Sequence, residues 1–465
     1  MVGRRREHDG RRSGSVARRV SRPRVVVHGH FYQPSRLDPA TGLVPPEPSA
    51  APDRDWNSRI AADCYRPNAV LGNLARISWD LGPTIAGWME DADPVAYRGF
   101  VTGDGGLHGL AQPFHHTILP LASSADRRTE IRWGLRDFEL RFGRRPTGAW
   151  LPETAVDLET LRALADMGIT HTILAPWQLV APDLDTRRPY RVDVGDGRSI
   201  VIAAYDAGLS TSVSFEPDAT RDADWFAHER IGPRLASPIA DDGAPPFVLI
   251  ATDGELYGHH QPFRDLFLAR LVGETDLGYD VATLADVIGP DHGRPILPAT
   301  LVERTSWSCH HGVARWHEAC DCVPDGAWKT PLRSAFDRLA EAIDTQTEVI
   351  ARSLPGSPDP WGARDAYVDV VVRAIDADAF AAAWLADGAE HEASRRFLTL
   401  MAAQRWRLAM YASCGWFWES PVRLETALVI RAANHAARLV DGLAGTRLAD
   451  RLADDLRAVL PGAVA

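Results

Sequence analysis

The chain has 465 residues and a net charge of −11, because 62 acidic side chains outnumber 51 lysines and arginines. Hydrophobic residues make up 45% of the chain and charged residues 24%, which is typical of a globular protein whose core needs no disulfides. The negative charge argues against a nucleic-acid partner, and no run reaches the ~20 apolar residues of a membrane span. We therefore expect a cytoplasmic protein with no membrane partner; the sequence does not indicate its oligomeric state.

The N-terminal segment departs from this composition. Residues 1–23 are rich in arginine and poor in apolar side chains. No hydrophobic segment of secretory length follows, so the pattern does not indicate a signal peptide. It predicts a disordered basic tail, with a nucleic-acid or membrane-surface arm as the alternative.

The first strand is expected at residues 24–27, where a β-branched run precedes His28, Gly29 and His30. Polar residues at its end are typical of a buried strand that leads into a site. The next elements in chain order are a partly helical stretch at 68–88, a strand-like or loop segment at 115–121, a helix at 124–142 and a short strand at 148–151.

A clear alternation of strands and helices follows. The pattern predicts a helix at 157–167 that begins at an Asp cap, strands at 170–174, 199–205 and 247–251, and a helix at 266–272. Such alternation favours a parallel sheet, whose sites form just past the strand ends.

The character of the chain changes at about residue 334, where amphipathic helices replace the strands. We expect helices at 334–350, 397–412 and 424–443, with a Pro- and Ser-rich connection at 353–360. The predicted domains are a tail at 1–23, a catalytic domain at 24–300 and a helical domain at 301–465 that contributes to the cleft.

Two acids stand out by their context. Glu153 follows Trp150, Leu151 and Pro152 in the stretch GAWLPETAVD, and Asp253 ends the strand FVLIATD. Glycoside cleavage needs two carboxylates, one to attack or to activate water and one to protonate the leaving oxygen. A ring-lined, partly apolar cleft separates the pKa values of such a pair.

These motifs resemble those of the family 57 glycoside hydrolases, and most closely those of an uncharacterised subgroup with a C-terminal helical extension. The segments that carry the likeness are HGHFYQP (28–34), GLAQPFHHTILPLA (109–122), WLPE (150–153) and DGELYGHH (253–260). Two later segments resemble sequences of this subgroup alone: ERTSWSCHHGVARWHEACDC (303–322) and MYASCGWFWESP (410–421). The likeness covers nearly all of the chain after the tail.

The resemblance implies an α/β fold, a distorted parallel (β/α)7-type barrel followed by an α-helical C-terminal domain. It implies a retaining enzyme that acts on α-glucans through a glycosyl-enzyme intermediate, with hydrolysis and transglycosylation both open. Glu153 matches the family's nucleophile, and Asp253 matches its general acid/base. Well-studied amylases carry Glu near Ala111 or Gln112, and many members carry His-Trp where this chain has two histidines.

Further residues are expected to bind substrate. We expect His30 to lie in the cleft, and for His28 we give equal weight to a position in the cleft and one in the core. Glu255 is interpreted as a partner for a sugar hydroxyl or for His30 rather than as a third acid. Trp416 is expected to lean over the barrel mouth as a sugar platform. The complete predicted substrate-binding set is His28, His30, Gln33, His116, Trp150, Glu255, His259, Trp307 and Trp416.

Two rival functions stay open. His28, His30, Asp253 and His259 form a set that would suit a divalent metal, as in related barrel mannosidases and deacetylases. A non-catalytic glucan-binding protein is the other alternative. The main prediction includes no metal and no cofactor.

Three cysteines lie close together in the sequence, at Cys309, Cys320 and Cys322, with histidines 310, 311 and 317 among them. A small zinc site or a disulfide is possible on composition. The spacing does not match a standard Cys-x2-Cys pair, so we expect free buried thiols.

Overall fold

The structure is a computed structural model that describes residues 22–236, 245–273, 276–288 and 295–459. Its first sheet has the strand order β3-β2-β1-β8, and all of these neighbours are parallel. The strands are β1 (Arg24–Phe31), β2 (Ser78–Leu81), β3 (Gly109–Leu110) and β8 (Phe247–Asp253), with β9 (Asp280–Val281) also paired to β1. Both β1 and β8 are almost wholly buried, as their unbroken apolar runs predict.

The second sheet has the order β10-β6-β7-β4. β4 (His171–Leu174) runs parallel to β7 (Arg198–Ala204), whereas β6 (Pro189–Gly195) forms an antiparallel hairpin with β7. Asp196 and Gly197 turn this hairpin with φ angles of 56° and 71°, as an Asp-Gly turn favours. The remaining strands are β10 (Leu297–Pro298), β5 (Leu179–Val180) and β11 (Thr300–Leu301), the last two paired antiparallel to each other.

Residues 148–149 link the two sheets. Ala149 bridges to Ala111, and Gly148 bridges to His171, both in parallel orientation. On the other side, the amide of Asp206 donates a 2.8 Å hydrogen bond to the carbonyl of Leu249. The two sheets therefore form a single succession of parallel neighbours whose carboxyl ends lie along one edge. The order along this edge is β8, β1, β2, β3, the 148–149 segment, β4 and β7.

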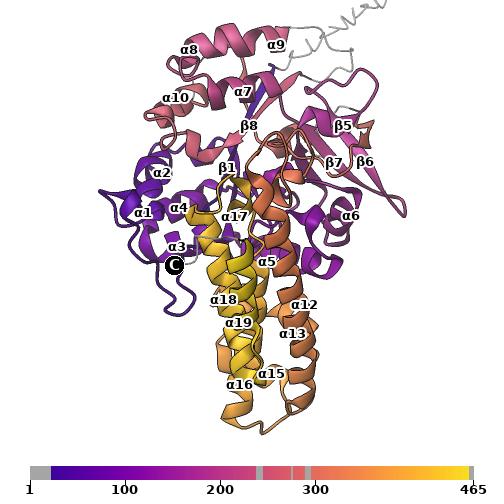
Figure 1. Cartoon of the computed structure of the whole chain (residues 1–465). Helices are drawn as coiled ribbons and strands as arrows, with labels where there is room; N and C mark the ends of the chain where they lie inside the picture. Colours follow the sequence, from indigo (N-terminus) through magenta and orange to yellow (C-terminus); the bar gives the residue numbers. More distant parts are fainter. Residues whose placement is uncertain (1–21, 237–244, 274–275, 289–294, 460–465) are drawn as a thin grey trace, which may run out of the picture.

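Helices surround these strands (Figure 1). α6 begins at Asp157, whose side chain accepts a hydrogen bond from the amide of Thr160 and so caps the helix. The helices in this part of the chain are α1 (Trp56–Ile60), α2 (Arg66–Val70), α3 (Pro83–Ala92), α4 (Pro94–Gly103), α5 (Ser124–Phe142), α6 (Leu158–Asp166), α7 (Ala207–Phe215), α8 (Ala223–Trp225), α9 (Gly232–Ala236), α10 (Arg264–Leu271) and α11 (Leu284–Ile288).

The C-terminal part is helical, and its long helices form a bundle that projects away from the strands (Figure 1). A hydrophobic core that includes Leu332, Phe336 and Ala433 holds the bundle together. Among the described residues, no helix is both long and apolar enough to cross a membrane. The helices are α12 (Lys329–Ser353), α13 (Pro360–Ala366), α14 (Val368–Val371), α15 (Ala377–Trp384), α16 (His391–Ala409), α17 (Cys414–Phe417), α18 (Leu424–Ala444) and α19 (Leu448–Val459).

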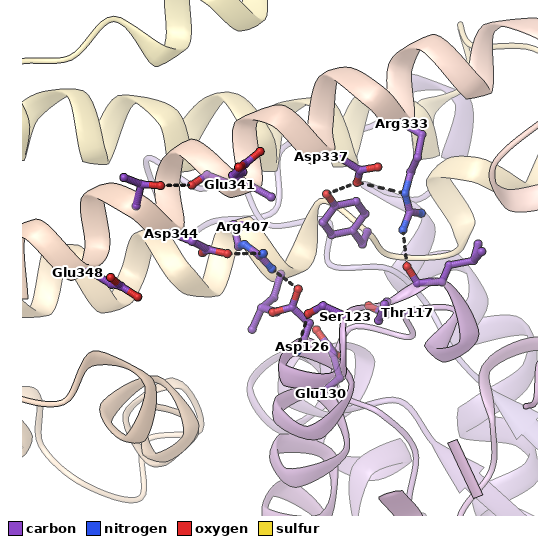
Figure 2. Close-up of a pocket in the computed structure, with 16 residues that line it drawn as sticks. Thr117, Ser123, Asp126, Glu130, Arg333, Asp337, Glu341, Asp344, Glu348 and Arg407 are labelled. Carbon is purple, nitrogen blue, oxygen red and sulfur yellow. Dashed lines mark hydrogen bonds and ion pairs between the residues drawn. The ribbon is translucent and has the colours of Figure 1, made fainter. Parts of the chain in front are cut away.

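Buried ion pairs join the bundle to α5 (Figure 2). Asp126 accepts hydrogen bonds from Arg364 at 2.9 Å and from Arg407 at 2.5 Å, and Arg407 also pairs with Asp344 at 2.7 Å. Asp126, Asp344 and Arg407 border a cavity of about 430 Å³ whose lining includes neither Glu153 nor Asp253. Loss of one partner here would leave a buried charge uncompensated, so the network ties the two parts of the chain together.

Most predicted elements match the structure, and the differences include three strands. The prediction of a partly helical stretch at 68–88 misses β2, which lies between two helices. The prediction also misses β6, because its alternating pattern is short and begins with Pro189. β1 extends four residues beyond the predicted end. The expectation of a disordered basic tail lies outside the described residues.

Candidate active site

The carboxyl ends of three neighbouring strands bring together two histidines and two acids. His30 on β1 lies in register with Asp80 on β2 and with Asp253 on β8. Asp80 is buried and bonds both histidines of the first motif, at 3.0 Å to His28 Nε2 and 2.8 Å to His30 Nδ1. Gln112 donates a further bond to Asp80 at 2.7 Å. Asp80 therefore fixes both rings in position.

Glu153 sits on a strained turn that follows the 148–149 segment. Glu153 and Thr154 have φ angles of 58° and 48°, in the left-handed region that costs a non-glycine residue about 1–3 kcal/mol. A loop from the end of the α/β part runs alongside and stabilises this turn. The amide of Trp307 donates to the carbonyl of Glu153 at 3.1 Å, and the amide of Val156 donates to that of Thr305 at 3.0 Å.

The Glu153 carboxylate is held by two donors from the same loop. Trp307 Nε1 donates at 2.9 Å and Ser308 Oγ at 2.7 Å, and both bonds go to Oε2. The Trp307 ring packs edge-on against Trp150 with centroids 5.0 Å apart. The orientation of Glu153 is therefore set by residues far away in the sequence.

Asp253 and Glu153 interact electrostatically. Asp253 is the exposed last residue of β8. Desolvation is the main cause that raises the pKa of Asp253 to about 6, and the negative charges of Glu153 and Asp80 raise it further, while His30 opposes the shift. The charge of Glu153 therefore acts on Asp253, although the two residues come from distant segments of the chain.

His30 supplies the positive charge of the site. Its burial disfavours protonation, but the carboxylates of Asp80, Asp253 and Glu255 outweigh burial and raise the pKa of His30 to about 9. Glu255 is buried as well and accepts hydrogen bonds from Tyr65 Oη at 2.6 Å and from the amide of Tyr32 at 3.2 Å. Burial is the main cause that raises the pKa of Glu255 to about 7.

His116 connects the site to the helical domain. Its Nε2 lies 3.1 Å from His30 Nε2, and its Nδ1 lies 2.6 Å from Ser413 Oγ. Burial first, and then the charge on His30, lower the pKa of His116 well below its ordinary value, so the ring is neutral. Tyr32 stacks on the ring with centroids 3.8 Å apart. Ser413, just before α17, therefore positions a histidine that contacts His30.

The middle of the chain matches a known family. Residues 100–279, which contain both Glu153 and Asp253, match the model described as Glycosyl hydrolase family 57. This segment is therefore similar to glycosyl hydrolase family 57. Residues 325–461, in the helical part of the chain, match a separate model described as a domain of unknown function, DUF3536.

Solved structures share this fold. The chain superimposes on an exo-type maltose-forming amylase from Pyrococcus sp. ST04 with a TM-score of 0.73 and 16% identity, covering 93% of this chain and 82% of that one. It is similar to a GH57-type branching enzyme from Pyrococcus horikoshii (TM-score 0.64, 15% identity, 94% of each chain). A third similar structure is an α-amylase from Thermotoga maritima (TM-score 0.58, 13% identity, 95% of this chain and 98% of that one). A search of the curated proteins returned no match.

Two residues predicted to bind substrate lie beneath the site instead of on its surface. His28 and Trp150 are both fully buried and stack on each other with centroids 4.9 Å apart. The burial of His28 matches the core position, one of its two expected places, whereas the predicted role of Trp150 as an exposed substrate contact does not match its full burial. Trp150 also stacks on His30 at 5.0 Å, so the pair supports the site from below.

Trp416 is also not where the sequence places it. Its ring is buried in the helical domain, where it stacks on Trp328 and packs edge-on against Phe336. Its Nε1 donates to the carbonyl of Met410 at 3.3 Å. The prediction of a sugar platform over the barrel mouth is therefore wrong, because α17 packs this face against α12 and α18.

Gln33 and His259 lie at the edge of the described network. Gln33 Oε1 accepts a bond from Arg36 at 3.1 Å, and His259 Nδ1 pairs with Asp63 at 3.0 Å. The proposed metal set of His28, His30, Asp253 and His259 does not come together, since Asp80 and Asp63 hold its histidines separately. Among the described residues, the side chains close enough to share one ion form a different group, discussed below.

Four residues of the site have no place in the sequence-based prediction. Asp80 follows a short apolar run, ISWD, which is the signal for a strand that ends in an acid. No local sequence pattern marks the other three residues, because each bonds a residue far away in the chain. These bonds are Tyr65 to Glu255, Ser308 to Glu153 and Ser413 to His116.

Proposed function

We propose that the chain is a retaining glycoside hydrolase or transglycosylase that acts on α-glucans through a glycosyl-enzyme intermediate. The observation that carries the proposal is that the negative charge of Glu153 raises the pKa of Asp253, and both acids lie in a segment that matches family 57. We also propose that the succession of parallel segments forms the (β/α)7-type barrel, with residues 24–300 as the catalytic domain and residues 301–465 as the helical domain.

In the first step, Glu153 attacks the anomeric carbon, and the bond from that carbon to the glycosidic oxygen breaks. Ser308 and Trp307 both donate to Oε2, which leaves Oε1 as the attacking atom. Asp253 gives its proton to the departing oxygen. A pKa of about 6 suits this role, because a useful fraction of the carboxyl stays protonated near neutral pH.

In the second step, the Asp253 carboxylate removes a proton from a water molecule or from an acceptor sugar hydroxyl. The oxygen of that acceptor bonds to the anomeric carbon, and the bond to Glu153 breaks. The positive charge of His30 beside Asp253 stabilises the carboxylate form between the two steps. Water as the acceptor gives hydrolysis, and a sugar gives transfer.

The remaining polar groups of the site would hold the sugar. We assign His30, His116, Gln33, Glu255 and Trp307 to substrate binding or orientation. His259 is proposed as a more peripheral contact, since its ring is partly exposed beside Asp63. The buried pair of His28 and Trp150 supports these groups from below.

The experiment is incubation of the purified chain with a panel of α-glucans and nitrophenyl α-glucosides, with products separated by chromatography. Shorter products indicate hydrolysis, and longer ones indicate transfer. The Glu153→Gln variant, run in parallel, must abolish both. A folded protein that changes none of these substrates would contradict the proposal.

A further inference from the structure

The loop that carries Trp307 and Ser308 continues into a cluster of four potential metal ligands. Cys309, His311, Cys320 and Cys322 each point one ligand atom into the same space, and these four atoms all lie within 4.8 Å of one another. The structure assigns to them a zinc-binding site of the Cys3His type, which we propose holds this loop in its functional conformation.

The distances within the cluster match tetrahedral zinc. Cys309 Sγ lies 3.8 Å from Cys320 Sγ, and Cys322 Sγ lies 3.5 Å from His311 Nδ1. With zinc–sulfur bonds of about 2.3 Å and zinc–nitrogen bonds of about 2.0–2.1 Å, a tetrahedron separates two sulfurs by about 3.8 Å and sulfur from nitrogen by about 3.5 Å. The two contacts therefore have the lengths of the edges of an occupied site.

The chemical type of the four ligands also indicates which metal would bind. Three thiolates and one imidazole are soft ligands that favour zinc over the hard cations magnesium and calcium. The alternative of a disulfide does not fit, because a disulfide bond brings its sulfurs to about 2.05 Å. Cys320 and Cys322 are only partly buried, which differs from the expectation of free buried thiols. Four ligands from the chain close the coordination shell, as in structural rather than catalytic zinc sites.

Surrounding groups orient the ligands. The second ring nitrogen of His311, Nε2, lies 3.9 Å from the exposed carboxylate of Asp321, within the range of an ion pair but too far for a hydrogen bond. The loop turns back at Gly312, whose φ is +75° and whose amide donates to the carbonyl of Cys309. The amide of Val323 donates to the carbonyl of Cys320 at 2.7 Å. The first of these bonds shapes residues 309–312, and the second shapes residues 320–323.

The position of the cluster suggests its role. Cys309 directly follows Ser308, which donates to Glu153, and Cys309 is buried in the hydrophobic core of the helical domain. A zinc ion here would join residues 309–311 to residues 320–322 and so shorten the free length of the loop. Its consequence for catalysis, the correct placement of Ser308 and Trp307, depends on the proposed function; the metal site itself does not.

The first test is metal analysis of the full chain, purified without a polyhistidine tag and without chelators. We expect about one zinc ion per chain. Replacement of zinc by Co2+ should produce the sulfur-to-cobalt charge-transfer absorption and the intense visible bands of tetrahedral thiolate cobalt. Absence of zinc together with failure to bind added Zn2+ or Co2+ would overturn the proposal, as would a Cys309–Cys320 disulfide in the peptide map of the unreduced protein.

Matched variants locate the ion. Cys322→Ser should lose the zinc, and His311→Ala should lose it to a chelator at least tenfold faster than the unmodified chain. His310→Ala changes the neighbouring exposed histidine, and Cys64→Ser changes a buried cysteine elsewhere, so both should keep the zinc. Equal zinc content in His311→Ala and His310→Ala, with equal chelator resistance, would contradict the assignment. Because His311 is exposed, its replacement is unlike a core substitution and should not prevent folding.

The role of the ion has a readout that does not need activity. Stripping zinc with a thiol-directed mercurial or a strong chelator should lower Tm and increase proteolysis within residues 303–323, and both should recover when Zn2+ is added. If zinc binds stoichiometrically yet neither property changes, the role in holding the loop is wrong. If zinc binds and orders the loop while no α-glucan is converted, the proposed function fails and the metal site stands.

Discussion

Ser308 Oγ donates a 2.7 Å hydrogen bond to Oε2 of Glu153, a residue 155 positions earlier in the chain. Trp307 donates to the same oxygen, so one loop supplies both donors to the candidate nucleophile. The backbone of Glu153 is held in the left-handed region by the same loop. Glu153, the loop and the proposed zinc ligands therefore form one continuous structural unit.

The first prediction concerns the nucleophile. Glu153→Gln should lower kcat on α-glucans by at least about a thousandfold, because the amide cannot form the glycosyl-enzyme bond. Circular dichroism and Tm should show an intact fold, since the amide oxygen can still accept from Ser308 and Trp307. Glu229→Gln, on an exposed helical surface, is the matched control and should keep full activity. Comparable activity in the two variants would remove Glu153 from the mechanism.

The second prediction separates the orientation of Glu153 from its chemistry. Ser308→Ala should lower kcat by about 10- to 100-fold, the equivalent of one hydrogen bond to a charged group. Steady-state kinetics should show a smaller change in KM, because the bond aligns the attacking atom rather than the sugar. Ser334→Ala removes an exposed hydroxyl on α12 and serves as the control. A change in KM alone would indicate that Ser308 contacts substrate directly.

The third prediction follows from the raised pKa of Asp253. As the general acid, Asp253 must be protonated, so kcat/KM should fall as the pH rises through about 6. In Asp253→Asn that limb should disappear. The variant should retain more activity on nitrophenyl α-glucosides than on α-glucans, since nitrophenolate leaves without a proton. An equal loss on both substrate classes would argue against Asp253 as the acid.

The same shift predicts a pH dependence of stability. A carboxyl whose pKa is raised by folding favours the folded state at low pH, and this contribution is lost as the pH rises through the folded pKa of about 6. Asp253→Asn should therefore raise Tm relative to the unmodified chain at pH 8 and have less effect near pH 4. Calorimetry at the two pH values measures this difference. An Asp253→Asn variant that lowers Tm at pH 8 would show that the charged form is stabilised in the fold.

The fourth prediction distinguishes the buried tryptophan from the one at the site. Trp416→Ala should destabilise the protein by about 3–5 kcal/mol, because it leaves a large cavity in the helical core. The molecules that remain folded should bind oligosaccharide with unchanged affinity. Trp307→Ala should do the reverse, with a smaller loss of stability and weaker binding. Denaturant unfolding and calorimetric titration of both variants provide the comparison.

The sequence by itself determined the features that depend on neighbours in the chain. Asp157 caps α6, the helical pattern of residues 124–142, rich in Arg and Glu, forms α5, and apolar runs form most of β1 and β8. The motifs around Glu153 and Asp253 were sufficient to indicate the family, which the match at residues 100–279 confirms. Caps, periodicity and motifs can be predicted because they involve residues a few positions apart.

Only the tertiary structure decided which side chains meet. Asp80 binds both histidines of the first motif, Ser413 reaches His116 from the helical domain, and Trp416 turns into a core instead of toward the site. The cysteine spacing likewise gave no standard motif, yet folding brings four ligand atoms together. Each of these outcomes depends on how segments far apart in the chain pack, and local periodicity carries no information about that packing.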